Sequence, residues 1–183
     1  IDTNVGFIKV DGVIYPRKCF SIENLKNQWD FYNDDKYVYV KSEREPSAVA
    51  SDIKFACNIH CMKFIDNVIV ENIVFMGTGA HGLQGTVHNA IVRNCEFHEI
   101  GGSELANYGV PGVRYGNGIE CWTDSNDVLV ENCRFSGIYD VAITMQGNHV
   151  TQGWTNMIFR NNVMWNCQQC FEIWSRGEFL RTF

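Results

Sequence analysis

NVIVENIVF, at residues 67–75, is the first of four related copies of one motif. It returns as NAIVRNCEF at 89–97, as DVLVENCRF at 127–135 and, more loosely, as NMIFRNNVM at 156–164. Another short segment of strand-forming residues follows each copy, at 82–86, 118–122, 142–146 and 170–174. Repeated short strands without a helical pattern between them are typical of a solenoid whose coils pair through their backbones. The sequence therefore predicts an all-β fold, a right-handed parallel β-helix, because parallel crossovers are almost always right-handed.

An asparagine stands in the middle of each copy, at Asn72, Asn94, Asn132 and Asn161. The first two are 22 residues apart, which suits a bare coil, and the later steps are longer and must carry insertions. On either side of the asparagine, every second residue is apolar. At the asparagine this alternation is shifted by one residue. Because Asn tolerates the left-handed backbone conformation, we expect each one to bend one strand into the next.

Aligning the second segments generates columns of side chains that alternate between the bore and the outer face. The inward columns are predicted to be Ile59, Leu83, Ile119, Ile143, Phe171 and Cys61, Gly85, Cys121, Met145, Ile173. The outward columns are predicted to be His60, Gln84, Glu120, Thr144, Glu172 and Met62, Thr86, Trp122, Gln146, Trp174. One outer face would then carry two carboxylates beside two tryptophans, which is unusual for a solvated strand.

Composition limits the possible partners. The 183 residues carry a formal charge of −6, which disfavours nucleic acid as a partner, and no apolar run is long enough to span a membrane. We expect one domain, with residues 1–50 as an entry segment and hairpin and 51–183 as stacked coils. The hairpin aromatics are expected to cover the open end of the stack as a lid. The chain has the look of a fragment truncated at both ends.

The eight cysteines have a simple explanation as small core residues. Cys95 and Cys133 fall in one inward column and are predicted to be buried in neighbouring coils. The spacing of Cys167 and Cys170 is a weak redox or zinc signal, and no metal site is predicted. Disulfide status stays open.

Two insertions are expected to overhang the outer face that carries Glu120. The longer, at 98–116, is rich in glycine and includes Arg114 and Tyr115, and the shorter, at 147–155, includes His149 and Trp154. Loops on a rigid scaffold are where binding groups usually lie.

The chain resembles the right-handed parallel β-helix proteins of the pectin-lyase-like superfamily, and in particular bacterial carbohydrate-active members near glycoside hydrolase family 141. The resemblance lies in residues 4–12, the WDFY hairpin at 29–32, YGNGIE at 115–120, YDVAITMQG at 139–147 and FEIW at 171–174. It implies a secreted, periplasmic or cell-surface protein that acts on a polysaccharide or oligosaccharide. It leaves the reaction open, because the superfamily includes hydrolases, lyases, epimerases and phage tailspikes.

The predicted outer face favours a glycoside hydrolase. Glu120 and Glu172 should be two coils apart, about 9.6 Å from the strand spacing, which suits inverting more than retaining hydrolysis. We expect Glu120 to be the acid, because it lies under the long insertion, and Glu172 to be the base. Substrate binding is predicted for Trp122, Trp174, His60, Gln84, Gln146, Arg114, Tyr115 and Arg176.

Two other functions stay open. A polysaccharide lyase would use Arg114 or Arg176 as base, often with calcium, although the sequence shows no column of Asp to hold that ion, and otherwise no cofactor is expected. A non-catalytic glycan-binding adhesin or tailspike segment would use the tryptophans without chemistry. The sequence leaves the sugar, the linkage and the oligomeric state undetermined.

Overall fold

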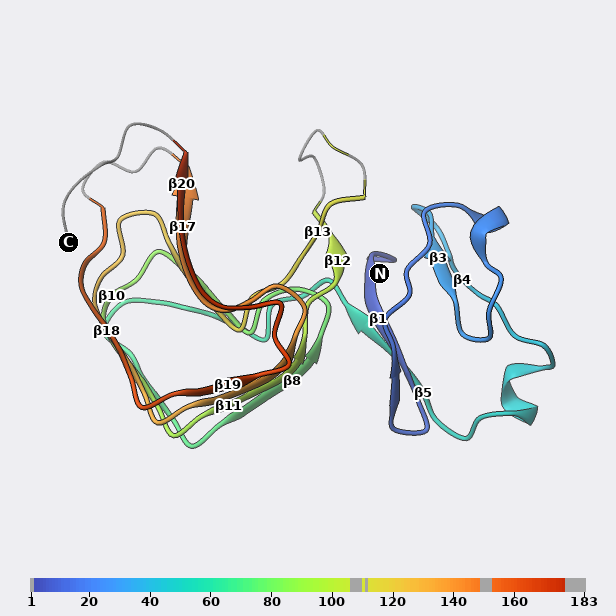
Figure 1. Ribbon diagram of the computed structural model, residues 1–183, viewed down its shortest axis with the longest axis horizontal. Helices are drawn as coiled ribbons and strands as arrows, with labels where there is room; N and C mark the ends of the chain where they lie inside the picture. Colours follow the sequence, from blue (N-terminus) through green and yellow to red (C-terminus); the bar gives the residue numbers. More distant parts are fainter. Residues whose placement is uncertain (1, 106–109, 111, 149–152, 177–183) are drawn as a thin grey trace.

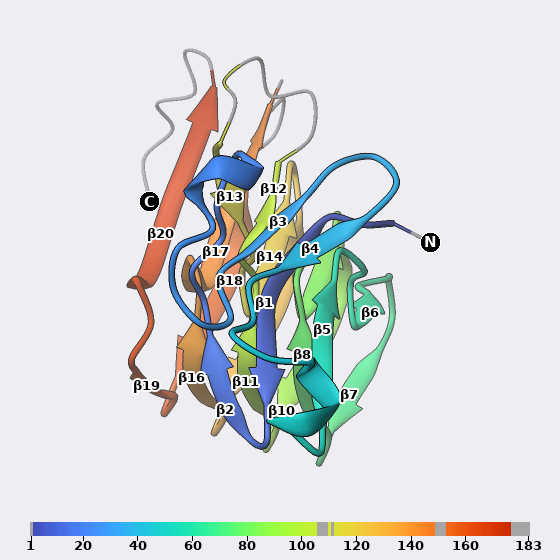
Figure 2. The same ribbon diagram turned by 90° about the vertical axis from the view of Figure 1, so that its right-hand side faces the viewer.

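The computed structural model describes residues 2–105, 110, 112–148 and 153–176, and these form an all-β parallel β-helix (Figure 1). One parallel sheet holds β7 (Ile69–Glu71), β10 (His88–Arg93), β15 (Asn126–Glu131) and β18 (Thr155–Arg160). The next holds β8 (Val74–Thr78), β11 (Glu96–Ile100), β16 (Arg134–Ile138) and β19 (Val163–Trp165). The third holds β6 (Met62–Lys63), β9 (Leu83–Gly85), β14 (Ile119–Trp122), β17 (Val141–Asn148) and β20 (Gln169–Arg176). Figure 2 shows the coils stacked side by side.

The motif repeats are stacked in register, as predicted. Val70, Val92, Val130 and Phe159 are direct neighbours on β7, β10, β15 and β18. The stack encloses one continuous apolar core, in which Phe75, Phe97 and Phe135 form a ladder with ring centroids 4.9 and 4.7 Å apart. Cys95 and Cys133 lie buried in neighbouring coils, as expected, and the structure holds all eight cysteines as free thiols.

The repeated asparagines bend the chain as predicted. Asn72, Asn94, Asn132 and Asn161 have φ angles of 58°, 53°, 53° and 56°, in the left-handed region. The first residue of each copy shows the same conformation, with φ between 51° and 56°. Two left-handed residues in each copy thus turn the chain at both ends of one short strand.

The predicted register is wrong for the first coil. Met62 pairs with Leu83 and Lys63 with Gln84, so this coil is displaced by three residues from the predicted alignment. Ile59 and Cys61 are exposed and Met62 packs against the core, whereas Phe64 is buried and takes the bore position. The displaced register buries a large aromatic ring in place of a small thiol, next to Gly85, where an added Cβ would meet the Phe64 backbone.

The N-terminal part forms a separate module beside the coils. β1 (Val5–Val10) pairs antiparallel with β2 (Val13–Tyr15) and with β5 (Ile53–Cys57), and β3 (Phe31–Asn33) pairs with β4 (Val38–Val40). Two short 3-10 helices, η1 (Ile22–Asn24) and η2 (Pro46–Ala48), complete it.

The expected hairpin is present, but its role as a lid is wrong. Trp29 and Phe31 pack with Val5, Ile8 and Val10 in a core of their own, and the module lies at the side of the stack (Figure 1). β5 therefore belongs to the N-terminal sheet, and parallel stacking begins at β6. Trp29 and Phe31 are buried within the module itself and so do not cover the bore.

The long insertion forms a second hairpin, β12 (Ser103–Glu104) with β13 (Arg114–Tyr115). It stands between the outer face of the coils and the N-terminal module (Figure 1). In the shorter insertion, Trp154 is buried and its indole N–H donates to the Cys121 carbonyl, so it belongs to the core and not to the outer face. His149 lies outside the described residues.

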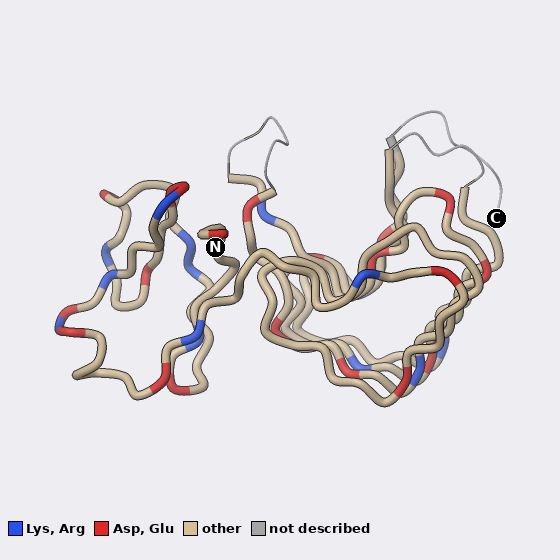
Figure 3. The backbone as a smooth tube through the Cα atoms, turned by 180° about the vertical axis from the view of Figure 1, so that it is seen from behind, with Lys and Arg blue, Asp and Glu red and all other residues tan. Residues whose placement is uncertain are grey.

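Charged side chains form ladders along one corner of the coils. Arg93 pairs with Glu71 and Arg160 with Glu131, each across one coil, and Figure 3 shows basic and acidic segments interspersed there. Such exposed pairs add little stability individually. No helix in the described part of the chain is long and apolar enough to cross a membrane.

Candidate functional site

A cavity of about 650 Å³ lies on the outer face of the third sheet. Its floor is made by side chains from β9, β14, β17 and β20, and the β12–β13 hairpin forms one wall (Figure 1). The strand register explains the floor, because Gln84, Glu120 and Thr144 are direct neighbours and Thr144 pairs with Glu172. The outward column predicted from the repeats is therefore confirmed from Gln84 to Glu172.

Glu120 is the most enclosed carboxyl group of the cavity, with 3% of its surface exposed. Its Oε2 accepts hydrogen bonds from the side-chain amides of Asn117, at 2.9 Å, and Gln146. The Asn117 amide is itself oriented, because its Oδ1 accepts the Val141 N–H at 3.0 Å and so turns its Nδ2 toward Glu120. Neighbouring coils thus hold this carboxyl group in one position.

His81 lies against the same oxygen, with Nε2 3.3 Å from Glu120 Oε2. Its Nδ1 accepts the Asn117 backbone N–H at 2.9 Å, so the proton of a neutral ring must be on Nε2, facing Glu120. The pKa of His81 is lowered to about 3, mainly by burial and further by the nearby His60. The ring is therefore uncharged beside Glu120, and the two residues do not form an ion pair.

Burial also controls the proton on Glu120. It raises the pKa of Glu120 to about 7, against the opposing hydrogen bonds from Asn117, Gln146 and Gln84. Desolvation disfavours the charged carboxylate, and the neutral donors offset only part of that cost. A carboxyl group with such a pKa can hold and release a proton near neutral pH.

Two further carboxyl groups line the cavity. Glu172 is half-buried and takes a 3.5 Å hydrogen bond from Thr144, while Asp140 lies at the bend before β17. Burial, and then the charge of Glu172, raise the pKa of Asp140 to about 6. The cavity therefore holds three acidic side chains with different degrees of enclosure.

The aromatic and amide residues predicted for binding also line this cavity. Trp122, Gln146 and Trp174 follow one another across three coils, with Trp122 partly buried and Trp174 40% exposed. Gln84 and Tyr115 are present as well, and the Tyr115 ring is inclined by 64° to the His81 ring with 5.0 Å between their centroids. A flat apolar surface thus borders the acidic floor.

His60 lines the cavity, but not from the strand position that the sequence predicted. It lies in the turn before β6, outside the column, and stacks on His81 with ring centroids 5.0 Å apart. Its Nδ1 accepts the His81 backbone N–H at 3.3 Å. His60 therefore supports the ring that contacts Glu120.

Arg114 lines the cavity but is held by backbone oxygens. Its guanidinium donates to the carbonyls of Gly102, Pro16 and Gly6 and lies 4.5 Å from the centroid of the Tyr139 ring. It joins the hairpin wall to the N-terminal module. The backbone of Arg176 pairs with Asn148 at the end of β20, and its side chain lies outside the described residues.

Sequence reasoning missed His81, Asn117 and Asp140. Asn117 and Asp140 lie within the YGNGIE and YDVAITMQG segments, which carry polar residues just before a strand of the third sheet. His81 lies shortly before β9, at the position that Asn117 has before β14. Extending the strand alignment toward the N-terminus would have placed His81 and Asn117 at one position and Asp140 one residue earlier.

Across the described ranges, no group of three or more His, Cys, Asp or Glu side chains is placed to hold a metal ion.

Comparison with known proteins gives distant relatives. Two curated proteins, both named pectate trisaccharide-lyase and both from Bacillus licheniformis, are each 28% identical to this chain over 110 residues. The match covers 51% of this chain and 31% of each relative, so the chain spans about a third of their length. No family model matches the chain. No solved structure matches it.

Proposed function

We propose that the cavity around Glu120 is the active site of a polysaccharide-degrading enzyme, most specifically a glycoside hydrolase. The observation that carries the proposal is the enclosed Glu120, whose pKa is raised to about 7 beside the more open Glu172 in the same column. Glycoside hydrolysis requires one carboxyl group that is protonated and one that is ionised. The cavity offers one enclosed carboxyl group, Glu120, and one more open one, Glu172.

In this mechanism Glu120 donates a proton to the oxygen of the leaving sugar. Because Asn117, Gln146 and His81 surround Oε2, the transferable proton belongs on Oε1. Glu172 takes a proton from a water molecule as that water attacks the anomeric carbon. Two strand spacings separate the residues, about 9.6 Å between Cα atoms, which favours inversion.

The remaining residues bind and orient the substrate. Trp122 and Trp174 offer flat faces for sugar rings on neighbouring positions of one column. Besides Glu120, which holds a proton in this mechanism, the lining has two carboxyl groups, Asp140 and Glu172, and one cation, Arg114. This balance favours a neutral glycan over a polyuronate, because like charges repel in an enclosed site.

A lyase is the second candidate, and the resemblance to two pectate trisaccharide-lyases favours it. It would need a base near a substrate carboxylate. Arg114 already donates to three backbone carbonyls, which disfavours that role for it. A lyase yields an unsaturated product with ultraviolet absorbance, whereas a hydrolase yields new reducing ends without that absorbance.

The test is turnover by the Glu120→Gln variant on a panel of plant and bacterial polysaccharides. We expect kcat to fall by a factor on the order of 10²–10⁴, because a positioned proton donor is lost. Glu71→Gln, which alters an exposed ion pair with Arg93, is the matched control and should keep full activity. Unchanged turnover in Glu120→Gln would exclude the acid role, and binding without turnover in the wild type would identify an adhesin.

A further inference from the structure

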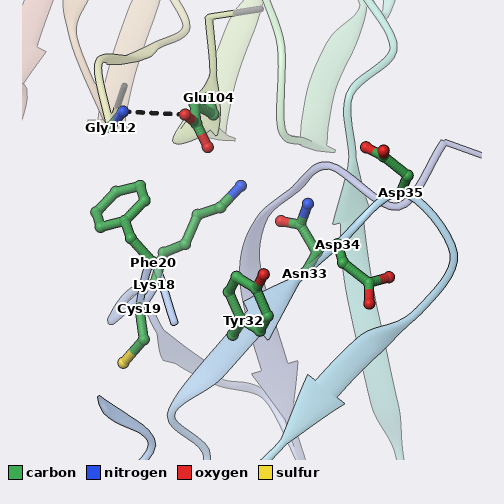
Figure 4. Close-up of a pocket in the computed structure, with 9 residues that line it drawn as sticks. All are labelled: Lys18, Cys19, Phe20, Tyr32, Asn33, Asp34, Asp35, Glu104 and Gly112. Carbon is green, nitrogen blue, oxygen red and sulfur yellow. Dashed lines mark hydrogen bonds between the residues drawn. The ribbon is translucent and has the colours of Figure 1, made fainter. Parts of the chain in front are cut away.

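A second cavity, of about 740 Å³, lies between the N-terminal module and the β12–β13 hairpin. Figure 4 shows its lining, which comes from three parts of the chain. These are residues 18–20, β3 with the turn after it, and the β12–β13 hairpin. The lining residues are Lys18, Cys19, Phe20, Tyr32, Asn33, Asp34, Asp35, Glu104 and Gly112. None of them lines the cavity around Glu120.

The floor of this cavity is held together by Asn4. Its Oδ1 accepts hydrogen bonds from Lys18 Nζ and from the Glu104 N–H, both at 2.8 Å, and its Nδ2 donates to the Glu104 carbonyl at 2.7 Å. The N-terminal module and the hairpin are therefore fixed to each other at this point. A ligand would meet a preformed surface.

Two buried polar groups of the lining keep unused hydrogen-bonding capacity. Lys18 is 7% exposed, and its ammonium donates to Asn4 Oδ1 and to the Val5 carbonyl, which leaves one of its three N–H groups. Asn33 Oδ1 is buried and has no hydrogen-bond partner within the described structure. A buried polar atom without a partner is costly, so a ligand that supplies one is favoured.

An aromatic surface lies beside these polar groups. Phe20 is 49% exposed, and Tyr32 presents a ring stacked on Tyr39 with centroids 5.8 Å apart. Figure 4 shows Phe20 and Tyr32 on one side of the cavity and the ends of Lys18 and Asn33 directed between them and Glu104. An apolar face next to a few fixed donors and acceptors suits a sugar ring, which has both kinds of surface.

The charge of the lining limits the class of sugar. Glu104, Asp34 and Asp35 outnumber Lys18, so a uronate would meet net repulsion. We propose that this cavity is a second glycan subsite, which binds a neutral sugar unit through Phe20, Lys18 and Asn33. The inference rests on the proposed function only in taking a saccharide as the ligand.

The test is a nuclear magnetic resonance titration of the Glu120→Gln variant, in which turnover is expected to be slow. The probes are cellohexaose, xylohexaose and mannohexaose, with hexagalacturonate as the anionic counterpart. We expect at least one neutral probe to give saturable shifts in the amides of residues 18–20, 32–35 and 104. Amides of residues 84, 120, 146 and 174 report the other cavity separately.

The amides of residues 18–20, 32–35 and 104 are the first set, and those of residues 84, 120, 146 and 174 are the second set. Phe20→Ala should weaken the binding that the first set reports about tenfold, because an aromatic contact is lost there. The binding that the second set reports should not change. Phe55→Ala removes another exposed phenylalanine, on β5, and should change neither set. The proposal is overturned if neutral probes shift only the second set, if Phe20→Ala has no effect, or if hexagalacturonate binds more tightly at the first set.

The outcomes also separate this inference from the proposed function. Wild-type turnover with no shift at residues 18–20 would overturn the subsite alone. Saturable shifts there without any turnover by the wild-type protein would support the subsite and overturn the enzyme. If no probe shifted either set of amides, the subsite would be overturned, and the cavity beside Lys18 and Phe20 would have no saccharide ligand.

Discussion

Coils inside the stack and the last described coil share one repeat but differ greatly in how far their side chains are exposed to water. Glu120, on β14, and Glu172, on β20, occupy one outward column, yet Glu120 is almost fully buried and Glu172 is half-exposed. The bore shows the same contrast, since Ile143 is 0% and Ile173 44% exposed. The repeat sets the direction of each side chain, and the neighbouring coils and loops set its burial.

This difference in burial would allow the two glutamates to have the two roles proposed for them. Glu120 is covered by His81, Asn117 and Gln146, and burial raises its pKa to about 7. Glu172 has a weak hydrogen bond from Thr144 and more contact with water. Two carboxyl groups separated only by their surroundings are a general way to obtain an acid and a base.

The largest expected effect compares two isoleucines of the bore. Ile143→Ala should lower the free energy of unfolding by about 2–5 kcal/mol, because a fully buried side chain leaves a cavity. Ile173→Ala should cost about 1 kcal/mol or less, because nearly half of that side chain is already exposed. Urea unfolding of both variants gives the two values. Equal costs would mean that Ile173 is covered in solution and that the contrast between coils is false.

The coils could be predicted because the sequence repeats their pattern. Val70, Val92, Val130 and Phe159 align in the sequence and in space, since a slip by one residue would turn every inward side chain outward. The first coil departs from the motif, so its alignment had no second copy to check it. There the burial of Phe64 set the register instead.

The site was predictable only in part, for a related reason. Residues on the strands, such as Glu120, Trp122 and Glu172, followed from the columns. His81 and Asp140 lie in bends before strands, where the backbone path depends on tertiary contacts and not on alternation. The N-terminal module has no repeat at all, so its position beside the stack required the three-dimensional packing of Trp29 and Phe31.

The next effect concerns the pH dependence of stability. Because the pKa of Glu120 is raised from 4.5 to about 7 in the folded state, the folded protein binds more protons than the unfolded chain between these values. Stability from this group is therefore lost as the pH rises from about 4.5 to about 7, by at most about 3 kcal/mol. Glu120→Gln should abolish that loss.

The difference between wild type and variant isolates Glu120. Asp140, with its raised pKa, adds a loss of the same sign, and His81, with its lowered pKa, adds a gain as the pH rises toward 6.5. Both remain in the variant and cancel in the difference. Urea unfolding at pH 5 and pH 8 should show that the variant gains on the wild type at the higher pH. If the difference in unfolding free energy between the variant and the wild type were the same at both pH values, Glu120 would have to be solvated in the folded protein.

The smallest effect separates local strain from stacking. Asn132, in an inner coil, and Asn161, in the outermost described coil, have left-handed φ angles of 53° and 56°. Replacing either by Ala should cost about 1 kcal/mol, because a Cβ without a local polar partner disfavours this conformation. Unlike the isoleucine pair, the two costs should agree, since the strain depends on the backbone of one residue and not on the coil beyond it. Asn132→Gly and Asn161→Gly are the matched controls and should be within a few tenths of a kcal/mol of the wild type, because Gly adopts positive φ freely. A much larger cost for Asn132→Ala than for Asn161→Ala would show that the ladder of asparagines is stabilised by contacts between coils, so that burial and bending could no longer be treated as independent.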